Sequence, residues 1–123
     1  MSITFVKTSF PNIKLGYTNR EKGFSRESFD KFNLSYNVGD FAKCVDDNRG
    51  LFKSHINAEV KWLNQTHTNV INNFEDYDNL ECDAICTDKP NQACIVLTAD
   101  CLPIILFDKK HQKLPQFMLD GKV

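Results

Sequence analysis

The sequence lacks long hydrophobic runs, long runs of one charge and the regular cysteine spacing of disulfide-bonded proteins. Its apolar stretches fall far short of the about 20 residues that span a membrane, and the first residues lack the basic start and apolar core of a signal peptide. With 15 basic and 16 acidic residues, the net charge of -1 provides no basic surface for nucleic acid. These absences predict a cytoplasmic protein with neither a membrane nor a nucleic-acid partner.

The five cysteines are odd in number and have no framework spacing, so we interpret them as free thiols in a reducing compartment, most of them small buried hydrophobic residues. Cys82 and Cys86 form a poor candidate for a metal pair, because the alternating residues between them predict a strand that separates them. No second pair of ligands follows at zinc-ribbon spacing. Cysteine spacing alone therefore predicts no metal site.

At 123 residues, with 41% hydrophobic and 25% charged side chains, the chain has room for one folded domain and no second. Apolar residues recur at helical spacing over residues 45–56, where Asp46 and Asp47 suit the start of a helix dipole. Residues 18–40 are a long polar loop, typical of a functional or mobile segment. One helix among many strands predicts a mixed α/β domain. The predicted strands cover residues 3–6, 13–17, 60–63, 70–71, 84–87, 93–98 and 103–107.

Two short strings carry most of the chemistry: Gln-Thr-His at residues 65–67 and Thr-Ala-Asp-Cys-Leu-Pro at residues 98–103. The second interrupts a buried apolar run, where the carboxylate of Asp100 is costly without a partner or a task. His67 and Cys101, held at strand ends, could together bind a soft metal or carry out nucleophilic chemistry. Taken singly, each is more often an ordinary turn histidine, buried thiol or turn-capping carboxylate. Only the combination predicts a site.

The order of these strings resembles the multicopper polyphenol oxidoreductase (laccase-like) family, also described as bifunctional purine nucleoside phosphorylase and adenosine deaminase. Residues 18–25 are similar to its T-x-R-x-G-G-V-S motif, residues 33–40 to N-L-G-x-H-V-G-D, and residues 48–52 to its N-R-x-x-L helix. The resemblance covers residues 13–108 and implies mixed sheets with helices packed outside, as in cytotoxic-necrotizing-factor and laccase-type domains. The departures from its pattern are Lys22, Ser35 and Asn37.

The resemblance also implies an activity and a metal site. Members cleave purine nucleosides of the adenosine, inosine and methylthioadenosine class with phosphate and deaminate adenosine, in a family historically named for polyphenol oxidation. Two histidines and one cysteine hold zinc, with copper as the alternative metal. Carried over, this makes His67 and Cys101 metal ligands and catalytic residues, with Asp100 orienting a ligand or the bound water.

Three further residues are candidates for binding substrate and phosphate: Arg20, Asn33 and Arg49. The planar guanidinium of arginine suits oxyanions, although Arg49 could equally be an ordinary helix-surface residue. Two other interpretations stay open. One is a metal-independent hydrolase using Cys101 and His67, which needs a readily ionised thiol. The other is a catalytically inactive fragment.

The family's third ligand, the histidine of H-A-G-W-[RK]-G, has no counterpart in this sequence. His111 lies in a charged turn and is not assigned the role. Residues 114–123 can be back-translated into codons with chosen third bases. When those bases are read in a shifted frame, they encode Ala-Ala-Ile-His-Ala-Gly-Trp-Lys-Gly, which contains the motif. The genetic code permits this reading without requiring it. We therefore predict a frameshift near Lys113, a fold incomplete at its C-terminus and a non-native coil over residues 114–123.

Overall fold

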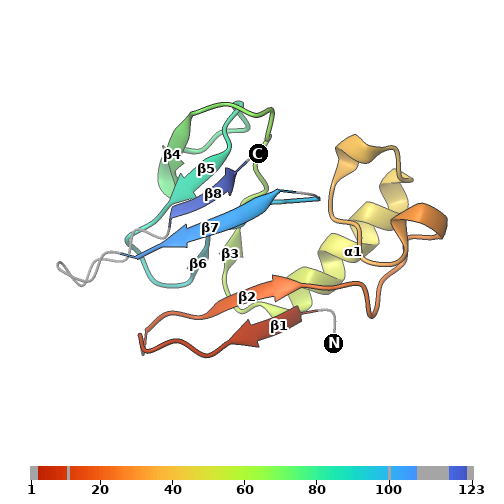
Figure 1. The fold of residues 1–123 in the computed structure, drawn as a ribbon, viewed down its shortest axis with the longest axis horizontal. Coiled ribbons are helices and arrows are strands. Elements are labelled where there is room, and N and C mark those ends of the chain that lie inside the picture. The colour runs from red at the N-terminus through yellow and green to blue at the C-terminus, as the bar shows by residue number, and fades with distance from the viewer. Residues whose placement is uncertain (1–2, 11, 100, 108–116, 122–123) are drawn as a thin grey trace. The chain divides into compact units, whose positions relative to one another are not determined.

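The computed structural model describes residues 3–10, 12–99 and 101–107, and the backbone of residues 117–121. The chain divides into two compact units, Met1–Asn57 and Ala58–Val123, and each is described by itself. Within the described residues there are one α-helix, three short 3-10 helices and eight strands (Figure 1). The predicted mixed α/β class is confirmed.

The first unit begins with a two-stranded antiparallel sheet. Strand β1 (Ile3–Val6) pairs with β2 (Leu15–Thr18), and these two strands correspond to the predicted strands over residues 3–6 and 13–17. The predicted long loop follows. It contains only two 3-10 helices, η1 (Glu27–Phe29) and η2 (Tyr36–Val38), and its backbone is held mainly by side chains, as described below.

The single α-helix, α1 (Ala42–His55), belongs to the first unit and buries Val45, Asn48 and Phe52. These residues lie at i, i+3 and i+7, so they share one face of the helix. Two of them are apolar and pack in the core, whereas the third, Asn48, is a fully buried polar residue. A polar group in that position needs hydrogen-bond partners, and these lie in the preceding loop.

The predicted placement of Asp46 and Asp47 at the start of the helix is wrong. The helix begins at Ala42 rather than Val45, so no acidic residue lies in its first turn. The dipole effect is confined to the ends of a helix, so these two residues act through side-chain pairs instead, and Asp46 accepts a hydrogen bond from the hydroxyl of Tyr36. Lys43 Nζ lies 3.1 Å from Asp47 Oδ2 at the i, i+4 spacing that favours such a pair.

The main sheet of the second unit has four strands in the order β4-β5-β8-β7. Strands β4 (Ile71–Asn73) and β5 (Ala84–Cys86) are parallel, and β8 (Phe117–Gly121) is antiparallel to both β5 and β7 (Leu102–Leu106). Strands β4, β5 and β7 therefore run in one direction (Figure 1). The residues just before each of these three strands lie at one end of the sheet, which we call its amino-terminal end.

A second, smaller pairing joins β3 (Glu59–Val60) to β6 (Gln92–Ala93) in parallel. The predicted strands over residues 60–63 and 93–98 were too long. Beyond Ala93 the chain is held near its neighbours by side-chain contacts rather than by a backbone ladder, as the contacts of Leu97 described below show.

The predicted coil over residues 114–123 is wrong for residues 117–121, which form β8. This strand lies between β5 and β7, with Ile104 opposite Leu119 and Leu102 opposite Gly121. The physical reason is that ladder bonds join backbone groups, so a segment can complete a sheet whatever its side chains are. Residues 114–116 and 122–123, the remainder of the predicted coil, lie outside the described residues.

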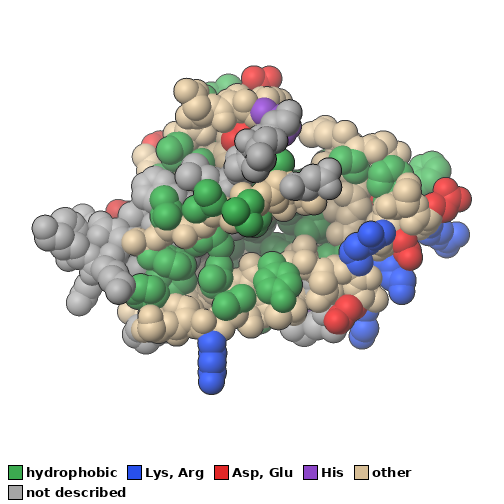
Figure 2. Space-filling view, viewed as in Figure 1, with side chains coloured by type: hydrophobic (Ala, Val, Ile, Leu, Met, Phe, Trp, Pro, Cys, Tyr) green, Lys and Arg blue, Asp and Glu red, His purple; other side chains and the backbone are tan. Residues whose placement is uncertain are grey.

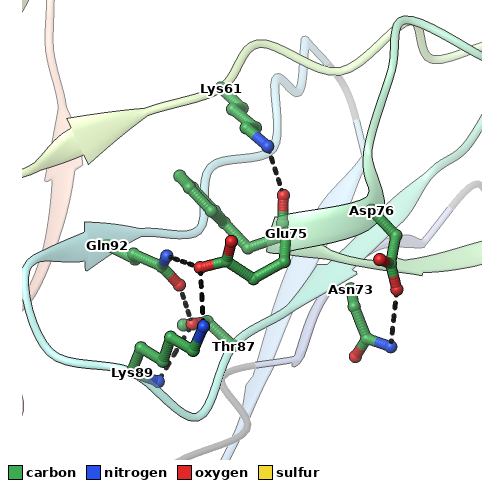
Figure 3. Close-up of polar contacts among 8 residues, drawn as sticks. Lys61, Asn73, Glu75, Asp76, Thr87, Lys89 and Gln92 are labelled. Atoms are coloured by element: carbon green, nitrogen blue, oxygen red, sulfur yellow. Dashed lines mark hydrogen bonds and ion pairs between the residues drawn. The ribbon is translucent and has the colours of Figure 1, made fainter.

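The core of the second unit is an apolar cluster around Phe74 and Ile85. Phe74 begins the 3-10 helix η3 (Phe74–Asp76). Next to it, Gln92 donates a hydrogen bond to the carboxylate of Glu75, and Lys89 forms an ion pair of 3.2 Å with the same group (Figure 3). These contacts fasten η3 to the turn between β5 and β6. The cluster consists of Leu63, Phe74, Tyr77, Cys82, Ile85 and Cys94, with Val96 packed against it.

One face of β7 remains apolar and exposed, since Leu102, Ile104 and Leu106 alternate along the strand and are all exposed. Figure 2 shows apolar side chains on the side of the molecule that carries this strand. None of the helices in the described ranges is long and apolar enough to cross a membrane.

Candidate active site

His67 lies in the turn between β3 and β4, before the amino-terminal end of the sheet. Its backbone is left-handed, with φ of 64°, and its side chain is exposed. For a residue with a Cβ atom this conformation costs about 1–2 kcal/mol. The turn therefore needs contacts that hold it.

Asp83 supplies those contacts from the position just before β5. Its Oδ2 accepts the backbone N–H of His67 at 3.0 Å, and its Oδ1 accepts the N–H of Thr68 at 2.6 Å and of Thr66 at 3.3 Å. The hydroxyl of Thr68 donates to the same Oδ1 at 2.8 Å. A single carboxylate thus binds three consecutive backbone N–H groups around His67.

The carboxylate of Asp83 is buried, with 4% of the residue exposed. Burial raises its pKa, but the hydrogen bonds from Thr68, His67 and Thr66 together outweigh burial and hold the pKa below its usual value. Asp83 is therefore ionised at neutral pH, with its charge neutralised by hydrogen-bond donors of the turn rather than by a cation.

Gln65 fastens the other side of the turn. Its side-chain Nε2 donates to the carbonyl of Leu97 at 2.9 Å, and its Oε1 accepts the N–H of Leu97 at 2.8 Å. The side chain of Gln65 thereby supplies the two hydrogen bonds that the backbone of a neighbouring strand would otherwise make with Leu97. This pair connects the Gln-Thr-His string directly to the segment that leads into the Thr-Ala-Asp-Cys string.

Cys101 is partly exposed and immediately precedes β7. Asp83 stands just before β5 and holds the His67 turn, so the turn and Cys101 both belong to the amino-terminal end of the sheet. Strand β8 separates β5 from β7, which corresponds to about 10 Å between their backbones. The topology thus places both predicted ligands at the same end of the sheet, while their joint binding of a metal stays a prediction.

The predicted metal site is incomplete within the part of the chain that the structure describes. A zinc site in a protein needs at least three ligands, and among these residues no three His, Cys, Asp or Glu side chains gather in that way. His67 and Cys101 have the right donor chemistry for two ligands. Asp100 and His111 lie outside the described residues, so the predicted orienting role of Asp100 stays a prediction.

All five cysteines are free thiols, as predicted. Cys82 and Cys94 are buried, and burial raises the pKa of Cys94 to about 12, so this thiol is inert at neutral pH. The prediction that most of the cysteines are buried is wrong, because Cys44, Cys86 and Cys101 are partly exposed.

The candidate substrate-binding residues lie in the first unit, where Asn48 is the centre of a buried hydrogen-bond network. The side chain of Asn48 donates to Ser25 Oγ and to the carbonyl of Asn33, both at 2.8 Å, and accepts the N–H of Phe24 at 2.7 Å. Ser25 in turn donates to Asp40 at 2.5 Å. This buried polar network fixes the two loop segments that resemble the family motifs.

Asn33, a predicted substrate- or phosphate-binding residue, takes part in the same network. Its Nδ2 donates to Asp40 at 3.1 Å and to the carbonyl of Ser35 at 3.0 Å. The hydrogen bond from Ser25, together with those from Asn33 and Phe41, lowers the pKa of Asp40 despite an opposing effect of desolvation. Asn33 therefore has a structural role in the loop.

The two candidate arginines are each bound to the loop. Arg49 Nε donates to the carbonyl of Leu34 at 2.8 Å, and its guanidinium lies 4.2 Å from the centre of the Tyr36 ring. Burial lowers the pKa of Arg49, which nevertheless stays charged at neutral pH. Arg20 donates from Nε to the carbonyl of Asp30. Arg49 is thus half-buried and oriented, rather than an ordinary helix-surface residue.

Sequence reasoning missed Asp83, Gln65 as an anchor, and the buried Asn48. A signal for Asp83 was present, because a carboxylate flanked by apolar residues at the start of a buried strand is costly without partners. The contacts of Gln65 and Asn48 join segments far apart in the sequence, so no local pattern indicates them.

A mixed α/β fold that carries Gln-x-His and Thr-Ala-Asp-Cys-x-Pro strings defines a laccase-like class of protein. The chain belongs to the multi-copper polyphenol oxidoreductase laccase family, which matches residues 14–115. The resemblance stated from the sequence is therefore confirmed.

Several curated relatives carry the name purine nucleoside phosphorylase. The relative from Haemophilus influenzae is 43% identical over 97 residues, which are 76% of this chain and 40% of that protein. The relative from Clostridium acetobutylicum is 33% identical over 108 residues, or 86% of this chain and 41% of that protein. The chain thus spans about two-fifths of the length of these relatives.

Solved structures share the fold. The crystal structure of a Neisseria meningitidis protein of family DUF152 superposes with a TM-score of 0.86 at 28% identity, over 98% of this chain and 51% of that one. The YfiH protein of Bacillus licheniformis, at 23% identity, shows the same fold with a TM-score of 0.72, over 88% of this chain and 45% of that one.

Proposed function

We propose that this protein takes part in the phosphorolysis of purine nucleosides, with adenosine deamination as a second reaction of the same site. Relatives from Haemophilus influenzae and Clostridium acetobutylicum, named purine nucleoside phosphorylase, support the first reaction. The chain spans about two-fifths of those proteins, so its share of the reaction rests on the residues that it contains.

The two reactions make different demands on a site. In phosphorolysis a phosphate oxygen bonds to C1′ of the ribose, the glycosidic C–N bond breaks, and the purine leaves with the electron pair and takes up a proton. In deamination the oxygen of water bonds to the purine carbon that carries the amino group, and the amino group leaves as ammonia. Both reactions require residues that bind an oxyanion or a water molecule and a proton donor within reach of the leaving group.

One observation carries the proposal for this chain: the exposed His67 is kept in a left-handed conformation beside the buried Asp83. A glycine would adopt this backbone without cost, and an exposed side chain gains little packing in return. Strained residues whose surroundings force their conformation cluster at active sites. His67 therefore has the properties of a functional residue independently of any relative.

We propose His67 and Cys101 as two ligands of zinc, with copper as the alternative metal and with further ligands outside the described residues. For phosphate we propose Arg20 and Arg49, and Asn33 for substrate. The contacts of Arg49 with Leu34 and Tyr36 support its role, because they fix the direction of the guanidinium before any anion arrives.

The experiment uses a version of the chain in which the predicted frameshift after Lys113 is reversed and which continues to the length of its relatives. We expect one bound zinc and release of purine base from nucleoside only when phosphate is present. His67→Ala and Cys101→Ala should each abolish both. His55→Ala and Cys44→Ala are matched controls in the first unit and should retain both. Equal nucleoside cleavage after His67→Ala or Cys101→Ala would show that the assigned roles are wrong.

A metal-independent hydrolase using Cys101 and His67 is the second candidate. The observation in its favour is that His67 and Cys101 both precede strands at the amino-terminal end of the sheet, while no three metal-ligating side chains gather among the described residues. Removal of metal with a chelator separates the two functions. Activity that survives full metal removal and is lost on alkylation of Cys101 would favour the hydrolase.

A further inference from the structure

The turn that carries His67 combines a backbone strain with a costly buried charge. His67 has φ of 64°, and Asp83 places a carboxylate in a site where 4% of the residue is exposed. Each feature alone destabilises the fold. They occur together because the carboxylate of Asp83 accepts the three backbone N–H groups that the turn directs at it.

The geometry of these bonds explains how the strain is maintained. Oδ2 of Asp83 accepts only the N–H of His67, whereas Oδ1 accepts from Thr66 and Thr68. All three N–H groups can reach one carboxylate only if the chain curls around it. The N–H of Asp83 itself donates to the carbonyl of Val70 at 3.2 Å, which closes the turn on its far side.

We propose that Asp83 is a positioning residue, which fixes the backbone of His67 in the left-handed conformation and so sets where the imidazole stands at the amino-terminal end of the sheet. This inference rests on the proposed function only in taking His67 as the histidine of the site. Asp83 contacts no reacting atom in the proposed reactions. It acts through the turn, and Gln65 anchors the same turn to Leu97.

A double-mutant cycle tests this inference without any activity measurement. His67→Gly should raise the midpoint of thermal unfolding of the 123-residue chain by about 4–8 °C, because glycine adopts the left-handed conformation without strain. In an Asp83→Asn background the turn is free to relax, so the same substitution should give no such gain. An equal gain in both backgrounds would overturn the proposal, since Asp83 would then be only a buried structural group.

Local measurements apply even if the variants do not unfold cooperatively. Amide hydrogen exchange at His67 and Thr68 should accelerate about tenfold or more in Asp83→Asn, because each amide loses a charged acceptor. The ring-proton resonances of His67 should move toward random-coil values, while those of His55 stay in place. Asp40→Asn is the matched control, since Asp40 is also a carboxylate with three donors but belongs to the first unit.

These outcomes are independent of the metal and of nucleosides. If the His67 amide and ring resonances are unchanged in Asp83→Asn, the positioning role is wrong, whatever the enzyme does. If they change as expected but the frame-restored chain neither binds zinc nor cleaves nucleosides, the turn is held as proposed and the proposed function is wrong.

Discussion

Gln65 and Leu97, which are 32 positions apart, form a reciprocal pair of hydrogen bonds through the side chain of one and the backbone of the other. The N–H and the carbonyl of Leu97 are both satisfied by one amide group, at 2.8 and 2.9 Å. This relationship brings the Gln-Thr-His and Thr-Ala-Asp-Cys strings of the sequence into one structural unit.

Gln65→Ala should lower the free energy of unfolding by about 2 kcal/mol, because both backbone groups of Leu97 lose a partner. Urea unfolding measures the loss, and amide exchange at Leu97 should accelerate with it. Gln92→Ala is the control. Gln92 donates to the exposed Glu75 and accepts from the hydroxyl of Thr87, so its loss leaves no backbone group without a partner and should cost clearly less. Similar costs for the two variants would contradict an anchoring role of Gln65.

Asn48→Ala should destabilise the chain by about 2–4 kcal/mol, since a fully buried amide that serves three partners is removed. Asn48→Asp should also destabilise it, because a carboxylate cannot donate to Ser25 or to the carbonyl of Asn33. Thermal unfolding of both variants, with the exposed Asn12→Ala beside them, gives the comparison. A neutral Asn48→Asp would show that the donor bonds are dispensable.

The free energy of unfolding should decrease in acid, and protonation of Asp83 should account for part of that decrease. The pKa of this buried group is lower in the folded chain than its ordinary value of 3.8, so the ionised form stabilises the fold. That contribution is complete above about pH 4 and is lost as the pH falls through the folded pKa. Urea unfolding between about pH 6 and pH 2.5 should therefore show a steeper acid decline for the native chain than for Asp83→Asn.

The control for this pH profile is Asp78→Asn, which changes an exposed acid of the same unit and should leave the acid decline as it is. Parallel pH profiles for the native chain and Asp83→Asn would mean that Asp83 is not ionised in the fold. The hydrogen bonds of the His67 turn would then need another explanation.

The 123-residue chain itself should show no zinc-dependent turnover of nucleosides. The reason is that the proposed zinc site has only two proposed ligands in this chain, His67 and Cys101, whereas a catalytic zinc site requires three. Assays with adenosine and inosine, with and without phosphate and added zinc, check this. Phosphate-dependent cleavage by this exact sequence would show that another residue completes the site, and His111→Ala would then test that histidine.

Much of the fold could be predicted from patterns along the chain, and some of it could not. Strands β1, β5 and β7 follow from short apolar runs bounded by turn residues. The helix also follows from its apolar spacing, although its start was misplaced because Phe41 precedes it without a capping side chain. The strand β8 could not be predicted, since its backbone pairs with β5 and β7 while its sequence fits neither helical nor strand periodicity.

The sequence by itself determined the family, the mixed α/β class and the choice of His67 and Cys101, because these depend on residue types at fixed spacing. Only the tertiary structure decided what holds them. The carboxylate of Asp83 binds the His67 turn, Gln65 binds Leu97, and Asn48 binds the loop around Asn33. Each of these contacts joins residues 15 or more positions apart. Their formation depends on how the chain folds back on itself, which no local spacing of residues encodes.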